Sequence, residues 1–461
     1  MLAGSADPAL RIGGGLGVVV VAAALAVAAR RFRWRPHLAV TLLVAAVLRV
    51  AMVVCASGIV PFDLLHDFPG AGWDVLHGLN PVLSERPGGW NYLPVYAWVL
   101  GADVAVYGHL HVSWLVIARL TAVVFDLGVV VMVGTVTGSE KRRRRFWYAC
   151  NPIPIMISAV HGQMEPACLV LLLGAFALAG IGAPGSARAG APRLALAGAP
   201  GPALAGAPGS ALAGARRRGR AARPLLAGAA LGLAIAVTTW PVLALPALLC
   251  AFPDWRARLR AAAATLAVPL AVVAALPLSG TPLTLVPKMF ARILGYTPPV
   301  GTWGWTAIAL LVHPLHGQLW TAPFAHALAR VGSVLTLAAV AGAAWWWRRA
   351  HPLDTATATF ICFLVVTPSF GDQYLDWPVP FLTARPTRFT GLLMPVLVAY
   401  ATINDLILPQ VSPGLYKLLS PTDFAASLIP IAALALAAPW WRRVAVVSHR
   451  ASPARAAITA G

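Results

Sequence analysis

The feature that most constrains this sequence is a series of long apolar runs that recurs along the whole chain. Residues 12–29, 37–60, 112–136 and 261–277 approach or reach the roughly 20 residues that a helix needs to cross a hydrocarbon layer about 30 Å thick. Charged residues make up only 11% of the chain, against about 25% in an average soluble domain. The sequence therefore predicts an all-α, polytopic integral membrane protein with about 9 to 13 membrane helices. Some of these are expected to be broken or re-entrant, with large external loops between them.

Basic residues indicate how the chain crosses the membrane. The net charge is +20, and Lys and Arg gather beside apolar runs at 30–35, 141–145, 216–223, 256–260, 348–349 and 442–443. Cytoplasmic loops of membrane proteins carry such an excess, so these clusters are interpreted as topology markers and not as a surface for nucleic acid. The five cysteines lie in apolar stretches without CxxC spacing, which favours neither a disulfide framework nor a metal site.

Placing the basic clusters inside predicts a topology for a multi-pass protein of the plasma membrane. Residues 61–92 become the first external loop and 279–303 the second. Residues 93–107 are then expected to lie in the membrane interface. Segments 146–182 and 224–252 begin and end beside basic clusters, so each is predicted to be a broken hairpin. Such breaks are tolerated where protein or a water-filled cavity surrounds them.

A tract rich in Ala, Gly and Pro divides the chain. An octad repeats at 195–202 and 203–210, and residues 183–223 hold no large apolar side chain other than Leu. Too little apolar surface is available for a packed core, so the tract predicts a disordered cytoplasmic linker. The predicted organisation is an N-terminal membrane region at 1–182, this linker, a C-terminal membrane region at 224–444 and a cytoplasmic tail at 445–461.

The few acidic residues collect on the predicted outer face. Of 15, seven fall there, namely Asp63, Asp67, Asp74, Glu85, Glu165, Asp372 and Asp376. Acidic residues contribute little to topology, so simple tolerance is one explanation. The density of the first loop favours a site, because FDLLHD, GWD, LNP and WNYLP follow one another in one short excursion. Carboxylates there could accept a proton from a hydroxyl in a loop that excludes water.

Four motifs carry a family resemblance. The run FDLLHDFPGAGWDVLHGLNPVLSERPGGWNYLPVY resembles the first external loop of bacterial glycosyltransferases of the GT-C superfamily, in particular the polyprenol-phosphate-mannose-dependent mannosyltransferase-like membrane proteins. NPIPIMISAVHGQMEP, GLAIAVTTWPVLALP and PSFGDQYLDWPVPF are similar to later signatures of that family, in the same order, between residues 60 and 381. Two positions depart from the pattern: Glu165 stands where Asp is common, and Thr238 or Thr239 where a basic residue often precedes Trp-Pro.

The resemblance implies a set of site residues. Asp63 and Asp67 are the candidates for a general base, with Asp63 first because it directly follows a helix end and matches the family's acidic position best. Lys288 and Arg292 would share one face of a short helix and bind the lipid phosphate, or else reach the lipid headgroups. The remaining substrate candidates are Asp74, Tyr92, His161, Gln163, Tyr296, Gln373 and Tyr374. Among these, Asp74 is expected in a structural or helix-capping role, and a buried His161 that satisfies the hairpin bend is the alternative to a substrate contact.

The activity implied by the resemblance is transfer of a sugar, mannose first, from a polyprenyl monophosphate to a lipid-linked glycan or other acceptor on the outer face. The expected partners are that donor, that acceptor and membrane lipids, without nucleic acid. No Walker A or dinucleotide fingerprint is present, and no metal-ligand cluster is evident, so cofactors stay open. Arg119 and Asp126 lie seven apart in one apolar run, and an ion-pair or packing role is favoured over chemistry for them. A transporter or flippase of lipid-linked sugars is the alternative function, favoured by the broken helices and by these two intramembrane charges. A non-catalytic glycolipid-binding protein is the third.

Overall fold

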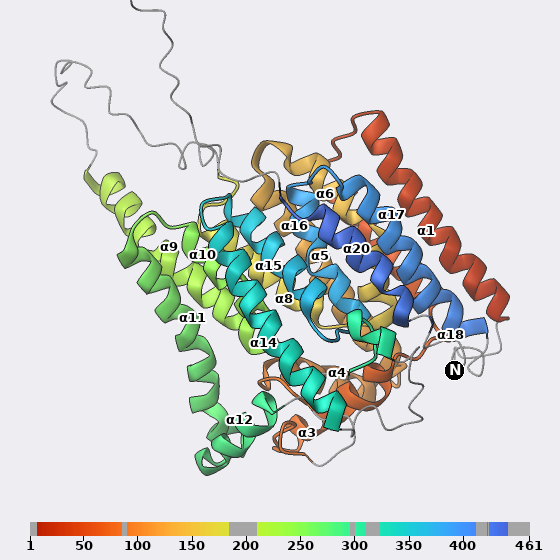
Figure 1. Cartoon of the computed structure of the whole chain (residues 1–461), viewed down its shortest axis with the longest axis horizontal. Helices are drawn as coiled ribbons and strands as arrows, with labels where there is room; N and C mark the ends of the chain where they lie inside the picture. Colours follow the sequence, from red (N-terminus) through yellow and green to blue (C-terminus); the bar gives the residue numbers. More distant parts are fainter. Residues whose placement is uncertain are drawn as a thin grey trace, which may run out of the picture.

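The chain folds into a bundle of helices in this computed structural model. The structure describes residues 7–84, 90–183, 210–295, 300–309, 323–411, 422 and 424–440, with the backbone alone at 210–221. These residues form helices and turns and contain no strand, which confirms the predicted all-α class. Figure 1 shows α1 (Pro8–Arg31) at one edge of the bundle and α9 (Ser210–Val237) with α11 (Trp255–Ala275) at the opposite edge.

Six helical stretches of the described residues are long and apolar enough to cross a membrane, as expected of a multi-pass membrane protein. Three are the single helices α1, α2 (Leu38–Cys55) and α14 (Pro323–Trp346). The others are composite: α5 (Trp114–Thr137) with η2 (Gly138–Glu140) and α6 (Lys141–Ala149), α11 with η6 (Leu276–Ser279), and α17 (Thr390–Ala401) with η10 (Thr402–Ile407) and α18 (Leu408–Val411). Helices α1, α2, α5 and α11 coincide with the apolar runs at 12–29, 37–60, 112–136 and 261–277.

Shorter helices fill the interior of the bundle. They include α7 (Pro152–Met156), η3 (Ile157–His161), α8 (Glu165–Leu178), η5 (Trp240–Ala244), α10 (Leu245–Cys250), α15 (Pro352–Val366), η9 (Asp372–Asp376), α16 (Val379–Ala384) and α20 (Leu428–Ala437). Two helix breaks fall where the sequence predicts bends, between η3 and α8 and between α9 and η5. At the first, Gly162 has φ +62°, and a Cβ there would lie 3.1 Å from the side chain of Leu64 and 3.2 Å from that of Arg119.

The predicted external loops form short helices at one end of the bundle. These are η1 (Asp63–Asp67), α3 (Phe68–Leu76), η7 (Leu283–Leu285) and α12 (Val286–Leu294). Helices α4 (Val95–Leu110) and η8 (Trp305–Ala307) follow these two loops in the chain, and α3, α4 and α12 are labelled together in Figure 1. Helix α4 occupies the segment predicted to lie in the interface. It packs closely on α3, since a Cβ on Gly72 would lie 2.6 Å from the carbonyl oxygen of Leu100.

The predicted linker is partly helical. Helix α9 begins at Ser210 and therefore includes the last fourteen positions of the segment 183–223. Ala, Leu and Arg are strong helix formers, and proline is absent from Ser210 until Pro224, which accounts for the difference. Residues 184–209 of the linker, and the predicted tail at 445–461, lie outside the described residues.

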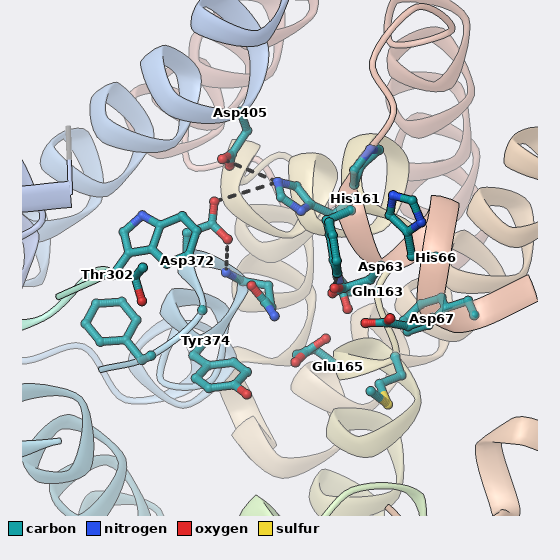
Figure 2. Close-up of a pocket in the computed structure, with 18 of the residues that line it drawn as sticks. Asp63, His66, Asp67, His161, Gln163, Glu165, Thr302, Asp372, Tyr374 and Asp405 are labelled. Carbon is teal, nitrogen blue, oxygen red and sulfur yellow. Dashed lines mark hydrogen bonds and ion pairs between the residues drawn. The ribbon is translucent and has the colours of Figure 1, made fainter. Parts of the chain in front are cut away.

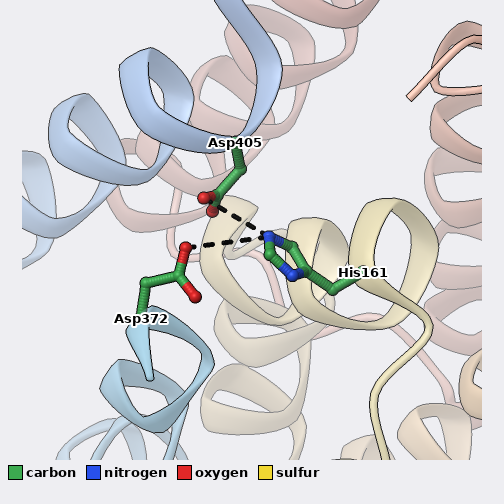
Figure 3. Close-up of side chains that lie close together, drawn as sticks. All are labelled: His161, Asp372 and Asp405. Carbon is green, nitrogen blue, oxygen red and sulfur yellow. Dashed lines mark ion pairs between the residues drawn. The ribbon is translucent and has the colours of Figure 1, made fainter. Parts of the chain in front are cut away.

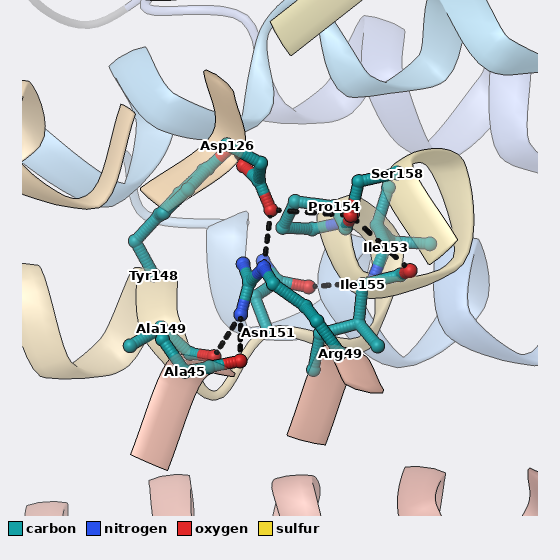
Figure 4. A network of polar contacts seen from close by, with 10 residues as sticks. All are labelled: Ala45, Arg49, Asp126, Tyr148, Ala149, Asn151, Ile153, Pro154, Ile155 and Ser158. Atoms are coloured by element: carbon teal, nitrogen blue, oxygen red, sulfur yellow. Dashed lines mark hydrogen bonds and ion pairs between the residues drawn. The ribbon is translucent and has the colours of Figure 1, made fainter. Parts of the chain in front are cut away.

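A buried polar network holds the centre of the bundle (Figure 4). Arg49 of α2 donates from Nε to Asp126 of α5 at 2.5 Å, and the Tyr148 hydroxyl donates to the same carboxylate at 2.7 Å. Arg119, predicted to share an ion-pair or packing role with Asp126, has other partners. It donates to the carbonyl oxygens of Ala56, Ile59 and Val160. Arg49 thus joins α2 to α5, and Arg119 joins α5 to η3 and to the segment after α2.

Candidate functional site

A cavity of about 820 Å³ opens among the loops and broken helices. Its walls come from segments far apart in the sequence: η1, residues 90–92, the break between η3 and α8, residues 302–303, residues 369–374, η10 and Phe424. The volume is that of a site for a small-molecule ligand. Most lining segments are loops or helix ends, which is where binding and catalytic side chains are commonly carried.

The cavity is strongly acidic. Five carboxyl groups line it, Asp63, Asp67, Glu165, Asp372 and Asp405, together with His66 and His161. No Lys or Arg occurs among the described residues of its wall. Figure 2 shows two groups, with Asp63, Asp67, Gln163 and Glu165 on one side and His161, Asp372 and Asp405 on the other.

The first group centres on a pair of aspartates. Asp63 accepts a hydrogen bond from Nε2 of Gln163 at 2.7 Å. Burial, reinforced by the charge of Asp63, raises the pKa of Asp67 to about 7. One carboxyl is therefore oriented by an amide, while its neighbour changes its protonation state near neutral pH.

The second group is built around His161. Its Nε2 atom lies 3.3 Å from Oδ1 of Asp405 and 3.8 Å from Oδ2 of Asp372. Asn404 bridges the two aspartates, because its Nδ2 donates to Oδ2 of Asp372 at 2.7 Å and to Oδ1 of Asp405 at 2.8 Å. Asp372 also accepts from the backbone N–H of Gln373 at 2.8 Å. Burial and the charge of Asp405 raise the pKa of Asp372.

Three π-helical turns present these groups. Asp63 and Asp67 are the first and last residues of η1, His161 is the last residue of η3, and Asp405 lies within η10. A π turn rotates the side chains that follow it relative to an α-helix, and such turns occur frequently at functional sites. Arg119 supports two of the turns, since its guanidinium contacts the carbonyl oxygens of Ile59, just before η1, and of Val160 in η3.

Aromatic side chains form the rest of the wall. Trp90 packs edge-on against Tyr92 with 5.6 Å between ring centroids, and Trp303 packs against Phe424 at 4.7 Å. Tyr374 stacks on Trp377 at 4.3 Å. Rigid aromatic faces beside hydrogen-bonding groups are suited to ligands that carry both apolar faces and hydroxyls.

The structure brings together seven of the residues that the sequence singles out. Asp63, Asp67, Tyr92, His161, Gln163, Gln373 and Tyr374 all line the cavity.

The other predicted residues lie elsewhere. Asp74 is buried inside α3, whose N-cap is Asp67, so it does not cap this helix, and the structural role expected for it stays a prediction. Lys288 and Arg292 lie on α12 outside the cavity wall, where Arg292 donates to the carbonyl oxygens of Val82 and Ser84 at 2.9 and 3.0 Å. Tyr296 lies outside the described residues.

Sequence reasoning missed Asn404 and Asp405, and it gave Asp372 and Glu165 no role in the site. The available signal was an aspartate two residues after an apolar stretch, residues 389–403, because a carboxylate at membrane depth is costly and often functional. What the run could not reveal is that η10 lies against His161.

No protein-family model matches the chain, and no curated protein matches it either.

Proposed function

We propose that the chain is a membrane glycosyltransferase of the GT-C type, which moves a sugar from a polyprenyl monophosphate to a hydroxyl of a lipid-linked glycan or another acceptor. The observation that supports this most is the combination, in one cavity, of the Asp63 and Asp67 pair, the amide of Gln163 and an aromatic wall. The order of the four sequence motifs supports it independently, since three of them supply cavity residues.

Asp63 is the proposed general base. The hydrogen bond from Gln163 orients this carboxylate, which would accept the proton of the acceptor hydroxyl. The acceptor oxygen forms a bond to the anomeric carbon, the bond from that carbon to the phosphate oxygen breaks, and the hydroxyl proton passes to Asp63. One base suffices because the phosphate leaves with its own negative charge, and a single displacement of this kind inverts the anomeric carbon.

The surrounding wall is proposed to bind the sugar. Tyr92 and Tyr374 present aromatic rings, and Gln373 presents an amide, at the same cavity as Asp63. Mannose is the first candidate, on the family resemblance alone. The outer face is the proposed location of the site, because the basic clusters of the sequence are assigned to the cytoplasmic side.

The proposal is tested by in vitro transfer from a synthetic polyprenyl-phosphate sugar to an extracted acceptor fraction. Asp63→Asn keeps the size and most hydrogen bonding of the side chain but removes the proton acceptor. Transfer should fall by roughly 10² to 10⁴, while donor binding persists. The matched control is Asp254→Asn, which alters an aspartate at the N-cap of α11, outside the cavity wall.

The transporter alternative gives the opposite result in the same preparation. Two buried charged groups, Arg49 and Asp126, cross-link the membrane helices, and such residues also mark transport pathways. If reconstituted wild-type protein moves lipid-linked sugars between leaflets and transfers none, the glycosyltransferase proposal is wrong. Full transfer activity in both Asp63→Asn and Asp67→Asn would remove the general-base assignment.

A further inference from the structure

One side of the cavity carries metal-ligating side chains that the transfer chemistry above does not use. His161, Asp372 and Asp405 each offer one ligand atom, and these atoms all lie within 4.8 Å of one another (Figure 3). Ligands about 2.0 to 2.1 Å from a tetrahedral Zn²⁺ lie about 3.3 to 3.4 Å apart. The separations of Nε2 of His161 from the two carboxylates, 3.3 and 3.8 Å, are close to that spacing.

Two buried oxygens beside these ligands point independently to a missing partner. Within the described part of the chain, Oδ2 of Asp405 and Oδ1 of Asn404 accept no hydrogen bond. Both residues line the cavity, and they are only 4% and 3% exposed. A buried carboxylate oxygen without a donor is destabilising. A cation would satisfy the oxygen of Asp405 and offset the charge that the two aspartates share.

The negative charge of the cavity indicates what such a cation would do. A phosphate ester entering a site with five carboxyl groups would be repelled, and no Lys or Arg of the described wall is present to compensate. Lys288 and Arg292, the cations expected from the sequence, lie outside that wall.

We propose that His161, Asp372 and Asp405 hold one divalent cation, and that an open position on this cation binds the phosphate of a prenyl phosphate. The identity of that phosphate as part of the sugar donor rests on the proposed function, whereas the metal site does not. One imidazole and two carboxylates form a ligand set suited to Zn²⁺ or Mn²⁺. Bound there, the cation would act as a Lewis acid toward the phosphate oxygens.

Metal binding is measured on the full-length protein in detergent, without any activity assay. The protein is treated with EDTA, dialysed, and titrated with Zn²⁺, Mn²⁺ or Co²⁺, and bound metal is counted by mass spectrometry. Wild type and Asp254→Asn should bind about one equivalent. His161→Gln and Asp405→Asn should bind the metal roughly tenfold or more weakly. Wild type that binds none of the three metals, or Asp405→Asn that binds as wild type does, would overturn the proposal.

A second readout covers a variant that fails to fold. Metal that binds the folded state raises the melting temperature of the wild-type protein, so the EDTA-treated wild type alone can be compared before and after each metal is added. A metal-dependent rise supports the site. No rise with any of the three, at concentrations well above micromolar, overturns it.

The phosphate step is tested with two probes, inorganic phosphate and citronellyl phosphate, on metal-free and metal-loaded protein. Citronellyl phosphate should bind roughly tenfold or more tightly when metal is present. An equal gain for inorganic phosphate would overturn the assignment to a prenyl phosphate, and no gain for either would overturn the phosphate role.

Transfer assays separate this inference from the proposed function. Sugar transfer by metal-free protein would refute the inference and leave the glycosyltransferase standing. Binding of metal and prenyl phosphate without transfer of any sugar would refute the glycosyltransferase and leave the metal site standing.

Discussion

Replacing Arg119 by Met should destabilise the protein and loosen one wall of the cavity. The guanidinium is fully buried and donates to three carbonyl oxygens, those of Val160 at 2.8 Å, Ala56 at 3.0 Å and Ile59 at 2.6 Å. The carbonyls of Ala56 and Ile59 belong to the segment between α2 and Asp63. The carbonyl of Val160 belongs to η3, which ends at His161. Met preserves the length and apolar contacts of the side chain but leaves the carbonyls without their donor.

The magnitude follows from the contacts. Each hydrogen bond from a charged donor contributes about 1.5 to 3 kcal/mol, so three would contribute about 5 to 9 kcal/mol. Removing the guanidinium also removes the cost of burying its charge, which offsets part of that sum. We expect a net loss of about 3 to 5 kcal/mol in the free energy of unfolding, because three buried carbonyl oxygens lose their donor at a cost of about 1 to 3 kcal/mol each.

Denaturant unfolding in detergent measures the total effect, and hydrogen exchange measures where it falls. Amides of the segments around Ile59 and Val160 should exchange faster in Arg119→Met, while those of α14 should not. The control is Arg143→Met, because Arg143 is 31% exposed and pairs with Glu140 within one helical turn, a contact that contributes at most about 1 kcal/mol. A loss below about 1 kcal/mol in Arg119→Met, or exchange that accelerates equally across the bundle, would refute the reasoning.

Three further predictions concern single groups. Because the pKa of Asp67 is raised to about 7, transfer should increase as pH rises through 7, when Asp67 loses its proton and the Asp63 and Asp67 pair can accept the proton of the acceptor hydroxyl; Asp67→Asn should abolish that limb of the pH–rate profile. Asp376 is fully buried, and neither of its carboxylate oxygens has a hydrogen-bond partner among the described residues. Burial raises its pKa, so the neutral Asp376→Asn should unfold within about 1 kcal/mol of wild type, and a larger loss would show that the charged form is required. In intact cells, cysteines at Ser84 and Pro282 should react with an impermeant maleimide and one at Arg349 should not, and the reverse pattern would invert the predicted topology.

Much of the bundle could be predicted because membrane helices are long apolar runs. The run at 112–136 became α5, and each of the predicted broken hairpins, 146–182 and 224–252, contains a helix break. Asp63 and Gln163 could be anticipated from local motifs, and the structure joins them by a hydrogen bond. The predicted linker at 183–223 overlaps helix α9, which begins at Ser210, because the helix-forming residues after Ser210 favour a helix there.

The remaining contacts depend on how distant helices lie against one another, which no local pattern encodes. Asp126 was expected to relate to Arg119 on its own helix, but it pairs with Arg49 of α2, because α2 and α5 pack together. His161 lies in η3 and Asp405 in η10, and nothing in either local sequence indicates that the two segments lie close together. Arg292 is a further example. Its sequence position suggested phosphate binding, but its guanidinium donates to backbone carbonyls of the first loop, a contact that the sequence does not reveal.

The three π turns explain why the chemistry gathers where the sequence is least regular. A membrane helix satisfies its backbone internally, so an uninterrupted α-helix through this region would direct its polar side chains along one fixed face. The π turns η1, η3 and η10 interrupt that regularity beside the cavity, and each delivers at least one titratable side chain to it. Their poorer backbone geometry is offset by side-chain contacts from neighbouring segments, namely Arg119 to Val160 in η3 and Asn404 of η10 to Asp372. The buried polar groups are thus part of what keeps the irregular turns folded, so stability and the acidic site depend on the same residues.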